Sequence, residues 1–414
     1  MITVMQLMES MDLPKKEVSN YIPNDISFDI LSKLPMKSLK RFSCVCKFWS
    51  NLFEKPQFMD IYRISLFASK YEDHHNSCFL LKQSLDLSED NILLLSGETF
   101  ENKVKLDWPP PFKEYRKRFY IVGSIVNGIL CLCRGNGRGD TNYINQEVVL
   151  WNPSTEDFKV IPSGSFNHAI LKAFPPDTIF EDLPLMFTFV NIYGFCYDPV
   201  ADDYKLIRNF YFIDSKKFEL DLNICPHDET LWQIYSLKSN SWRDIQVKMP
   251  NHYYNDEWKQ NGNGIYFHGM CHWWGYRDHL KEHMLVSFNL RDEVFIITHS
   301  NPNYHVFDRH MFILKDSIAT IDYEEPYNIF ISVLGEIGVT ESWTRLFRIG
   351  PLPYSTSPIG VGINGDIFLN RYGEIEKFNL NTNLIEEIGI TGRIIRCQMI
   401  IYNSSIFPIG GIHS

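Results

Sequence analysis

Histidine and cysteine side chains gather in one short stretch of this sequence, and such side chains can bind a metal. The spacing of these residues could supply a tetrahedral zinc set, whose members would be His268, Cys271, His272, His279 and His283. No Cys-x-x-Cys pair is among them, and the last two histidines lie in a charged segment. His272 is followed by two tryptophans, a pattern typical of a strand in an apolar core. We therefore expect strand residues here, with no metal and no cofactor.

Other local patterns that could support catalysis are incomplete. Residues 135–139 (GNGRG) look like a phosphate-binding loop, but the Lys-Ser/Thr ending and the following helix are missing, so a hairpin loop is expected. Cys131 and Cys133 are two apart in a predicted strand, where they share a face without forming a redox motif. The sequence has no Gly-x-Ser-x-Gly elbow, and the paired carboxylates at 202–203 and 324–325 fall in predicted turns. We expect no catalytic residue.

The composition limits the classes of protein to consider. Apolar residues make up 44% of the 414 residues and charged residues 22%, the balance of a globular protein. The formal net charge of -10 disfavours nucleic acid and anionic membranes as partners. No apolar run is long enough to span a membrane, and the nine cysteines form no dense disulfide framework. We therefore expect a protein of the cytosol, the nucleus or both.

One stretch, residues 22–63, has a helical period. Asn24 or Asp25 can cap a first helix, whose apolar stripe would end at Pro35 and contain Ile26, Ile30, Leu31 and Leu34. Apolar residues then recur at three and four positions in a second helix, namely Leu39, Phe42, Val45, Cys46, Trp49, Leu52 and Phe53. About 40 residues bury a poor core alone, so the pattern predicts a small all-α module with an exposed apolar face. A helical hairpin packed on the larger domain is the alternative.

The rest of the chain is predicted to be mainly β. A unit of two strands and a polar turn recurs, with anchors at Trp151, Tyr235, Phe288, Val333 and Phe378. The later intervals are 53, 45 and 45 residues, which is the size of one propeller blade. Another strand pair precedes each unit, and strands near 78–82 or 91–95 can join the C-terminal strand to close the ring. We predict a β-propeller of six blades rather than a β-sandwich.

The helical stretch resembles the F-box. Ile22-Pro23, Leu34-Pro35, residues 37–39 (KSL), residues 45–47 (VCK) and Trp49 occur in that family's order. The resemblance implies that these helices bind the Skp adaptor and, through it, the cullin of an SCF (Skp-cullin-F-box) ubiquitin ligase. The adaptor-binding residues it implies are Ile22, Pro23, Ile26, Ile30, Leu31, Leu34, Pro35, Leu39, Val45, Cys46, Lys47 and Trp49.

The remaining segments resemble the F-box-associated interaction domain of plant F-box proteins, including S-locus F-box and kelch-like relatives. The pieces that carry the resemblance are residues 127–132, 151–155, 193–198, 203–205, 272–273, 338–339 and 341–344. The implied organisation is a disordered lead at 1–19, the F-box at 20–63, a substrate-binding propeller at 64–409 and a tail at 410–414. The implied function is non-catalytic: capture of an unknown protein for ubiquitination and degradation. The alternative is a propeller enzyme or glycan-binding protein with the helices as a cap.

If the propeller is a receptor, loops at one mouth of the ring are expected to contact the target. The candidate segments are residues 164–191, 212–230, 250–263 and 299–309, which are rich in Phe, Tyr, His and Asn.

Overall fold

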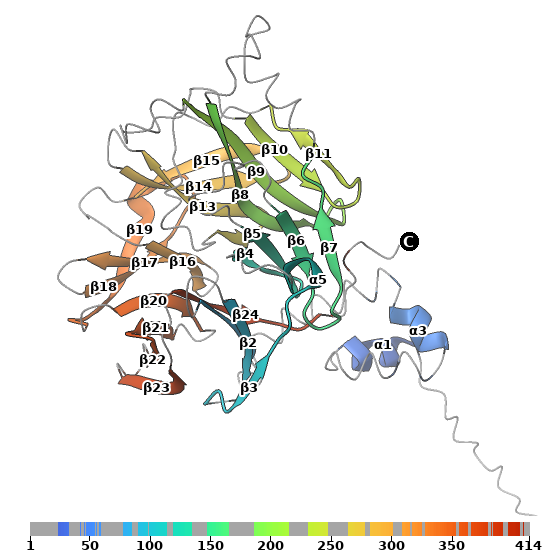
Figure 1. The fold of residues 1–414 in the computed structure, drawn as a ribbon, viewed down its shortest axis with the longest axis horizontal. Coiled ribbons are helices and arrows are strands. Elements are labelled where there is room, and N and C mark those ends of the chain that lie inside the picture. Colours follow the sequence, from blue (N-terminus) through green and yellow to red (C-terminus); the bar gives the residue numbers. More distant parts are fainter. Residues whose placement is uncertain are drawn as a thin grey trace, which may run out of the picture. The chain divides into compact units, whose positions relative to one another are not determined.

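The chain forms two compact units in a computed structural model, one covering Met1–Asp73 and the other His74–Ser414 (Figure 1). The described residues are 24–32, 42, 45, 47–53, 55, 58, 78–84, 90–97, 99–113, 119–134, 147–164, 186–214, 231–246, 264–277, 282–300, 309–314, 317–324, 328–352, 356–362, 366–379, 382, 384–391, 396–405 and 409. The first unit contains α1 (Asn24–Ser32) and α3 (Lys47–Phe53). Within the described part of the chain, no helix has the length and apolarity needed to cross a membrane.

The second unit is built from six antiparallel sheets of four strands, which we call blades 1 to 6. Blade 1 contains β24 (Arg396–Tyr402), β1 (Cys78–Ser84), β2 (Asp90–Ser96) and β3 (Asn102–Lys105). Blade 2 contains β4 (Phe119–Val126), β5 (Ile129–Arg134), β6 (Glu147–Trp151) and β7 (Phe158–Ile161). Blade 3 contains β8 (Met186–Asp198), β9 (Asp203–Asp214), β10 (Leu231–Ser236) and β11 (Ser241–Asp244).

The other three blades have the same order of strands. Blade 4 contains β12 (Ile265–Phe267), β13 (Met270–Arg277), β14 (Glu282–Asn289) and β15 (Val294–His299). Blade 5 contains β16 (Arg309–Leu314), β17 (Ser317–Glu324), β18 (Asn328–Leu334) and β19 (Trp343–Ile349). Blade 6 contains β20 (Thr356–Val361), β21 (Ile367–Arg371), β22 (Glu374–Asn379) and β23 (Leu384–Thr391). A helical turn, α5 (Pro110–Lys113), precedes β4, and a 3-10 turn (Thr340–Ser342) precedes β19.

The six blades form a closed ring. The first strand of each blade contacts the first strand of the next, from β4 round to β24, so these strands are innermost. The C-terminal strand β24 pairs with β1 from the other end of the domain, in a register that includes Leu81 opposite Met399. This pairing completes blade 1. The predicted mainly β fold, the six blades and the closure of the ring by both ends are confirmed.

The core lies between neighbouring blades, because both faces of each blade are covered. On β5, Cys131 and Cys133 point towards blade 3, whereas Leu130 and Leu132 point towards blade 1. All four side chains are fully buried. This alternation explains why β5 is a continuous apolar run and confirms that the two cysteines share a face.

Short turns join the strand pairs at positions that the sequence indicates. Asn127 and Gly128 both have positive φ (51° and 76°), as a two-residue hairpin turn requires, and Val126 pairs with Ile129 across it. Where the third strand of blades 2 and 4 ends, an Asn side chain accepts a backbone N–H two residues on: Asn152 from Ser154 and Asn289 from Arg291. The repeated unit therefore has a repeated turn chemistry.

Two of the loops expected at the mouth of the ring are shorter than predicted. β8 begins at Met186, inside the expected loop at 164–191, and β9 extends to Asp214, inside the expected loop at 212–230. The expected loop contains three prolines, the last of which is Pro184. No proline interrupts the apolar run that follows, so this run can form a strand. The long interval between the first two repeats is thus partly filled by strands of 13 and 12 residues. His299 and Arg309 likewise belong to β15 and β16.

Candidate functional site

The helical unit buries one set of apolar side chains. Leu31, Leu52 and Phe58 are almost fully buried. The ring of Phe28 meets that of Phe58 edge-on, with 5.0 Å between their centroids. This small cluster holds α1 against the segment that follows α3, and it uses only one side of α1.

A second set of apolar side chains in the same unit is exposed to solvent. Ile26 and Ile30 are 51% and 48% exposed, and their spacing of four places them on one face of α1. Val45 and Phe48 are 65% and 47% exposed. Exposed apolar side chains close together on a protein surface are typical of a surface that a partner covers.

The residues implied for adaptor binding fall into three groups. Ile26, Ile30, Val45 and Lys47 are exposed. Leu31 is buried, and Trp49 is half-buried against the ring of Phe42, with 5.3 Å between centroids. The other members lie outside the described residues, namely Ile22, Pro23, Leu34, Pro35, Leu39 and Cys46. Phe48, which is not among the predicted residues, is also exposed and lies three positions after Val45.

The propeller has two different faces, because its strands alternate in direction. The turns between first and second strands, such as 127–128 and 199–202, lie on one face, together with those between third and fourth strands, such as 237–240. We call this the short-turn face. The strand ends that flank residues 165–185, 215–230, 247–263 and 301–308 all lie on the opposite side, which we call the long-connection face.

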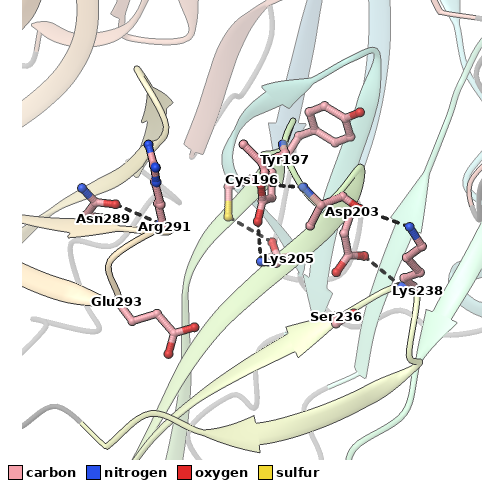
Figure 2. A network of polar contacts seen from close by, with 12 residues as sticks. Cys196, Tyr197, Asp203, Lys205, Ser236, Lys238, Asn289, Arg291 and Glu293 are labelled. Atoms are coloured by element: carbon pink, nitrogen blue, oxygen red, sulfur yellow. Dashed lines mark hydrogen bonds and ion pairs between the residues drawn. The ribbon is translucent and has the colours of Figure 1, made fainter. Parts of the chain in front are cut away.

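A network of polar contacts occupies the short-turn face at blades 3 and 4 (Figure 2). Lys205 Nζ donates to Asp198 Oδ2 at 2.6 Å, and Asp203 Oδ1 accepts the backbone N–H of Lys238 at 2.9 Å. Burial disfavours the charged form of Asp198, but hydrogen bonds from Lys205 and from two backbone N–H groups outweigh it. The pKa of Asp198 therefore lies below its usual value.

An ion pair links blade 3 to blade 4 beside this network. The guanidinium of Arg243 donates to both carboxylate oxygens of Glu293, one of them at 3.0 Å. The hydrogen bond from Arg243 holds the pKa of Glu293 below its usual value. A pocket of about 250 Å³ lies next to the pair and is lined by Asp203, Lys205, Ile234, Tyr235, Ser236, Ser239, Ser241 and Arg243. Both cations of the lining already pair with carboxylates, Lys205 with Asp198 and Arg243 with Glu293. We therefore interpret the pocket as part of the structural contact between blades 3 and 4.

Arg208 anchors the chain where it leaves blade 2 towards residues 165–185. The guanidinium is buried, donates to Gln233 Oε1 at 2.7 and 3.0 Å and to the carbonyl of Ser163 at 2.7 Å, and lies 3.6 Å from the ring of Trp242. Burial lowers the pKa of Arg208 to about 9, so the group stays charged at neutral pH. The Trp242 indole N–H also donates to the carbonyl of Pro162 at 2.7 Å.

The candidate zinc residues in the described part of the chain all belong to blade 4. Cys271 and His272 are neighbours on β13 and point to opposite faces. The fully buried His272 ring contacts Ser287 Oγ through Nδ1 at 2.8 Å and the Phe267 carbonyl through Nε2 at 3.3 Å. Burial lowers the pKa of His272 to about 4. Among the described residues no three His, Cys, Asp or Glu side chains could hold a metal ion together; His279 lies outside that set.

Comparison with known proteins gives two matches to protein families. The family described as "F-box associated beta propeller domain" matches residues 79–371, and the "F-box domain" family matches residues 21–60. Residues 135–139, which lie between β5 and β6, fall inside the propeller match but outside the described residues.

Individual relatives agree with these families. A putative F-box protein of Arabidopsis thaliana, At3g16210, is 25% identical over 66% of this chain; the matched part spans 59% of that protein's length. F-box only protein 8 of the same plant is 26% identical over 68% of this chain and 81% of its own length. Among solved structures, the match to a chain of a nidogen/laminin complex covers 80% of this chain and 99% of that other chain. At 9% identity and a TM-score of 0.42, that likeness supports no conclusion.

Proposed function

The chain belongs to the family of F-box proteins that carry an F-box associated beta propeller domain, and from this premise we propose that it is the substrate-recognition subunit of an SCF ubiquitin ligase. In this proposal the helical unit binds the Skp adaptor and, through it, the cullin, while the propeller binds a protein destined for ubiquitination. The chain itself is non-catalytic, since bringing a target close to the ubiquitin-charged enzyme is its whole contribution.

The exposed apolar side chains of the helical unit support the adaptor-binding half of the proposal. Ile26, Ile30, Val45 and Phe48 stay in solvent although the unit buries Leu31, Leu52 and Phe58. Burying a side chain of the size of Val, Ile or Phe against a partner contributes about 1.5–3 kcal/mol. Because these four side chains are already about half-buried, covering them contributes less than this full value, but it still favours binding.

Co-purification with a Skp adaptor tests this half directly. We expect the full chain to retain the adaptor, and Val45→Asp to lose it, because a carboxylate would replace an apolar contact. Val200→Asp is the matched control, since Val200 is an 86% exposed valine on a propeller turn. Phe48→Asp and the pair Leu34→Asp with Pro35→Ala test the same surface at other positions. Retention of the adaptor by all of these variants would favour the alternative that the helices are only a cap.

The directions of the strands support a receptor role for the long-connection face. Every segment of nine or more residues between described strands of blades 3 to 5 starts and ends on that face. β1, the first strand after the helical unit in the sequence, begins on the opposite, short-turn face, and β24 ends there. We infer that the target binds across the long-connection face. The short-turn face, where β1 begins and β24 ends, is then available for other contacts.

Capture of targets by the adaptor-blind Val45→Asp chain tests this second half. Proteins held by that variant are not delivered to the ligase, so they accumulate on it and are identified by mass spectrometry. Replacing residues 215–230 by a Gly/Ser linker of equal length is expected to abolish capture and to leave adaptor binding unchanged. Equal capture after this replacement, and after the same treatment of 247–263, would refute the assignment of the face.

We propose that the protein works in the cytosol or nucleus, which a fluorescent fusion checks.

A further inference from the structure

The outer strand of blade 5 contains a continuous run of exposed residues. Five consecutive residues of β19, Thr344 to Arg348, are exposed, and β19 is the last strand of its sheet. The apolar side chains of Leu346 and Phe347 are 50% and 39% exposed. The strand has no proline or glycine that would interrupt pairing with a further strand.

A β-bulge places two arginines of β19 on the same face. The register runs from Ile331 opposite Phe347 to Ser332 opposite Arg345, so Leu346 is the extra residue. In a regular strand, residues three apart would point to opposite faces. Here the guanidinium groups of Arg345 and Arg348 both lie over the ring of Phe330, at 3.6 and 5.7 Å. The bulge therefore concentrates two positive charges beside an apolar stretch.

The other outer strands lack this combination. β3, β7 and β11 have four residues each, which is too short for extended pairing. β15 has six residues, but only the two at its ends are exposed, and it contains no arginine or lysine. β23 has eight residues, but its exposed charges are acidic, and Lys103 from blade 1 donates to the carbonyl of Gly389 on it at 2.6 Å. In a chain of net charge -10, β19 is thus a local basic and apolar edge.

The charges decide which strand can pair with this edge. A second copy of β19 would bring Arg345 and Arg348 against identical arginines, which is unfavourable for strands side by side. An extended segment with Glu or Asp at alternate positions places its carboxylates on one face, where they can meet both guanidinium groups. The acidic strand β23 of another copy is a poorer candidate, because its Glu386 already pairs with Lys377 at 2.7 Å.

We propose that β19 is a docking edge at which an extended, acidic segment of a partner protein adds as a fifth strand to blade 5. Backbone hydrogen bonds would supply affinity, and Arg345 and Arg348 would select acidic side chains. The site uses neither the helical unit nor the long connections, so its test is independent of adaptor binding and of target capture.

Fluorescence polarisation with defined peptides tests the proposal. The probe is a labelled ten-residue peptide of alternating Glu and Val, and the full chain is expected to bind it saturably and to ignore the Lys-Val counterpart. Reversing both charges, Arg345→Glu with Arg348→Glu, is expected to weaken binding at least tenfold. Arg291→Glu with Lys238→Glu changes the net charge equally on the exposed turns of blades 3 and 4, and it is expected to have little effect.

Two further measurements decide between strand addition and other contacts. N-methylation of the Glu-Val peptide on both backbone edges keeps its charge but prevents strand pairing, and binding should be lost. Equal binding of the methylated peptide, no saturable binding of the parent peptide, or equal loss in the control variant would each overturn the proposal. Sedimentation velocity of the protein alone should show a monomer. Oligomers that disappear in the Arg345→Glu, Arg348→Glu variant would identify a second copy as the occupant and would also overturn it.

Discussion

The closure of the ring makes a sharp prediction at Gly128. An added Cβ at this position would lie 2.3 Å from Ser405 Cβ and 2.9 Å from the Ser405 backbone nitrogen, so the segment after β24 would have to move. That segment is held by Asn152, whose buried Nδ2 donates to the Ser405 carbonyl at 2.8 Å. Gly128→Ala therefore combines backbone strain at a φ of +76° with the loss of this hydrogen bond.

The loss of stability expected for Gly128→Ala can be worked out by comparison with a matched position in blade 4. Gly269 also has a φ of +76° and occupies the same kind of turn, but nothing lies within 4 Å of an added Cβ. The left-handed strain should cost about 1–2 kcal/mol in both variants. Leaving the buried amide of Asn152 without its acceptor should cost Gly128→Ala about 1–3 kcal/mol more. The excess measures how strongly the C-terminal segment secures blade 2 to blade 1.

Urea unfolding followed by tryptophan fluorescence and circular dichroism measures both variants against the parent protein. We expect Gly128→Ala to have the lower free energy of unfolding of the two. Equal destabilisation, or a larger effect of Gly269→Ala, would show that contacts of the C-terminal segment do not secure the ring.

Three other predictions concern buried polar groups. Arg208→Met should lower the free energy of unfolding by about 2–4 kcal/mol, because its buried acceptors lose their donor, whereas Arg291→Met on an exposed turn should have little effect in the same urea titration. The pKa of His272 is about 4 in the folded protein and near 6.5 in the unfolded chain, so the unfolded chain binds the proton more readily. The free energy of unfolding should therefore fall by about 3 kcal/mol as the pH is lowered from 6.5 to 4. His272→Gln should flatten that dependence in urea titrations across the range; an unchanged slope would contradict it. Burial raises the pKa of Cys133 and Cys397 to about 12, so iodoacetamide at pH 8 should label them, by mass spectrometry, only in denaturant.

The blade pattern was accessible from the sequence because each blade repeats its own chemistry. Anchors such as Trp151 and Phe288 lie at or next to the end of the third strand of a blade, and an Asn follows each to form the turn. The Asn127-Gly128 pair predicts its hairpin for the same reason, since few residues accept positive φ at two successive positions. Local turn chemistry and strand period thus predict the blades. The lengths of the strands in blade 3 were missed, as were the strand ends at His299 and Arg309.

The helical unit shows the limit of periodicity. The sequence places Ile26, Ile30 and Leu31 on one stripe, but α1 turns Leu31 inward and leaves the isoleucines in solvent. Neighbouring residues on a helix are about 100° apart, so a broad stripe on a short helix can be divided between a core and an exposed face. Only packing against residues such as Phe58 decides which side is buried.

The basic edge of β19 and the Arg208 anchor could not be predicted either. In a regular strand, side chains alternate between the two faces, and this pattern would place Arg345 and Arg348 on opposite faces. The bulge at Leu346 reverses the alternation for the residues beyond it, so the two arginines share a face. The contacts of Arg208 reach Ser163 from a different blade, and no local pattern marks such a pair. Both features depend on tertiary register rather than on composition or spacing.

Ubiquitination of captured proteins in cells tests the central claim most directly, because it requires the helical unit and the propeller to work in the same chain. Proteins that co-purify with the adaptor-blind Val45→Asp chain should carry ubiquitin when the parent chain or the Val200→Asp control is expressed. They should lack it when Val45→Asp is expressed, although they are still bound. Ubiquitination that is equal with the parent chain and with Val45→Asp, or that never occurs on a captured protein, would contradict the proposed role.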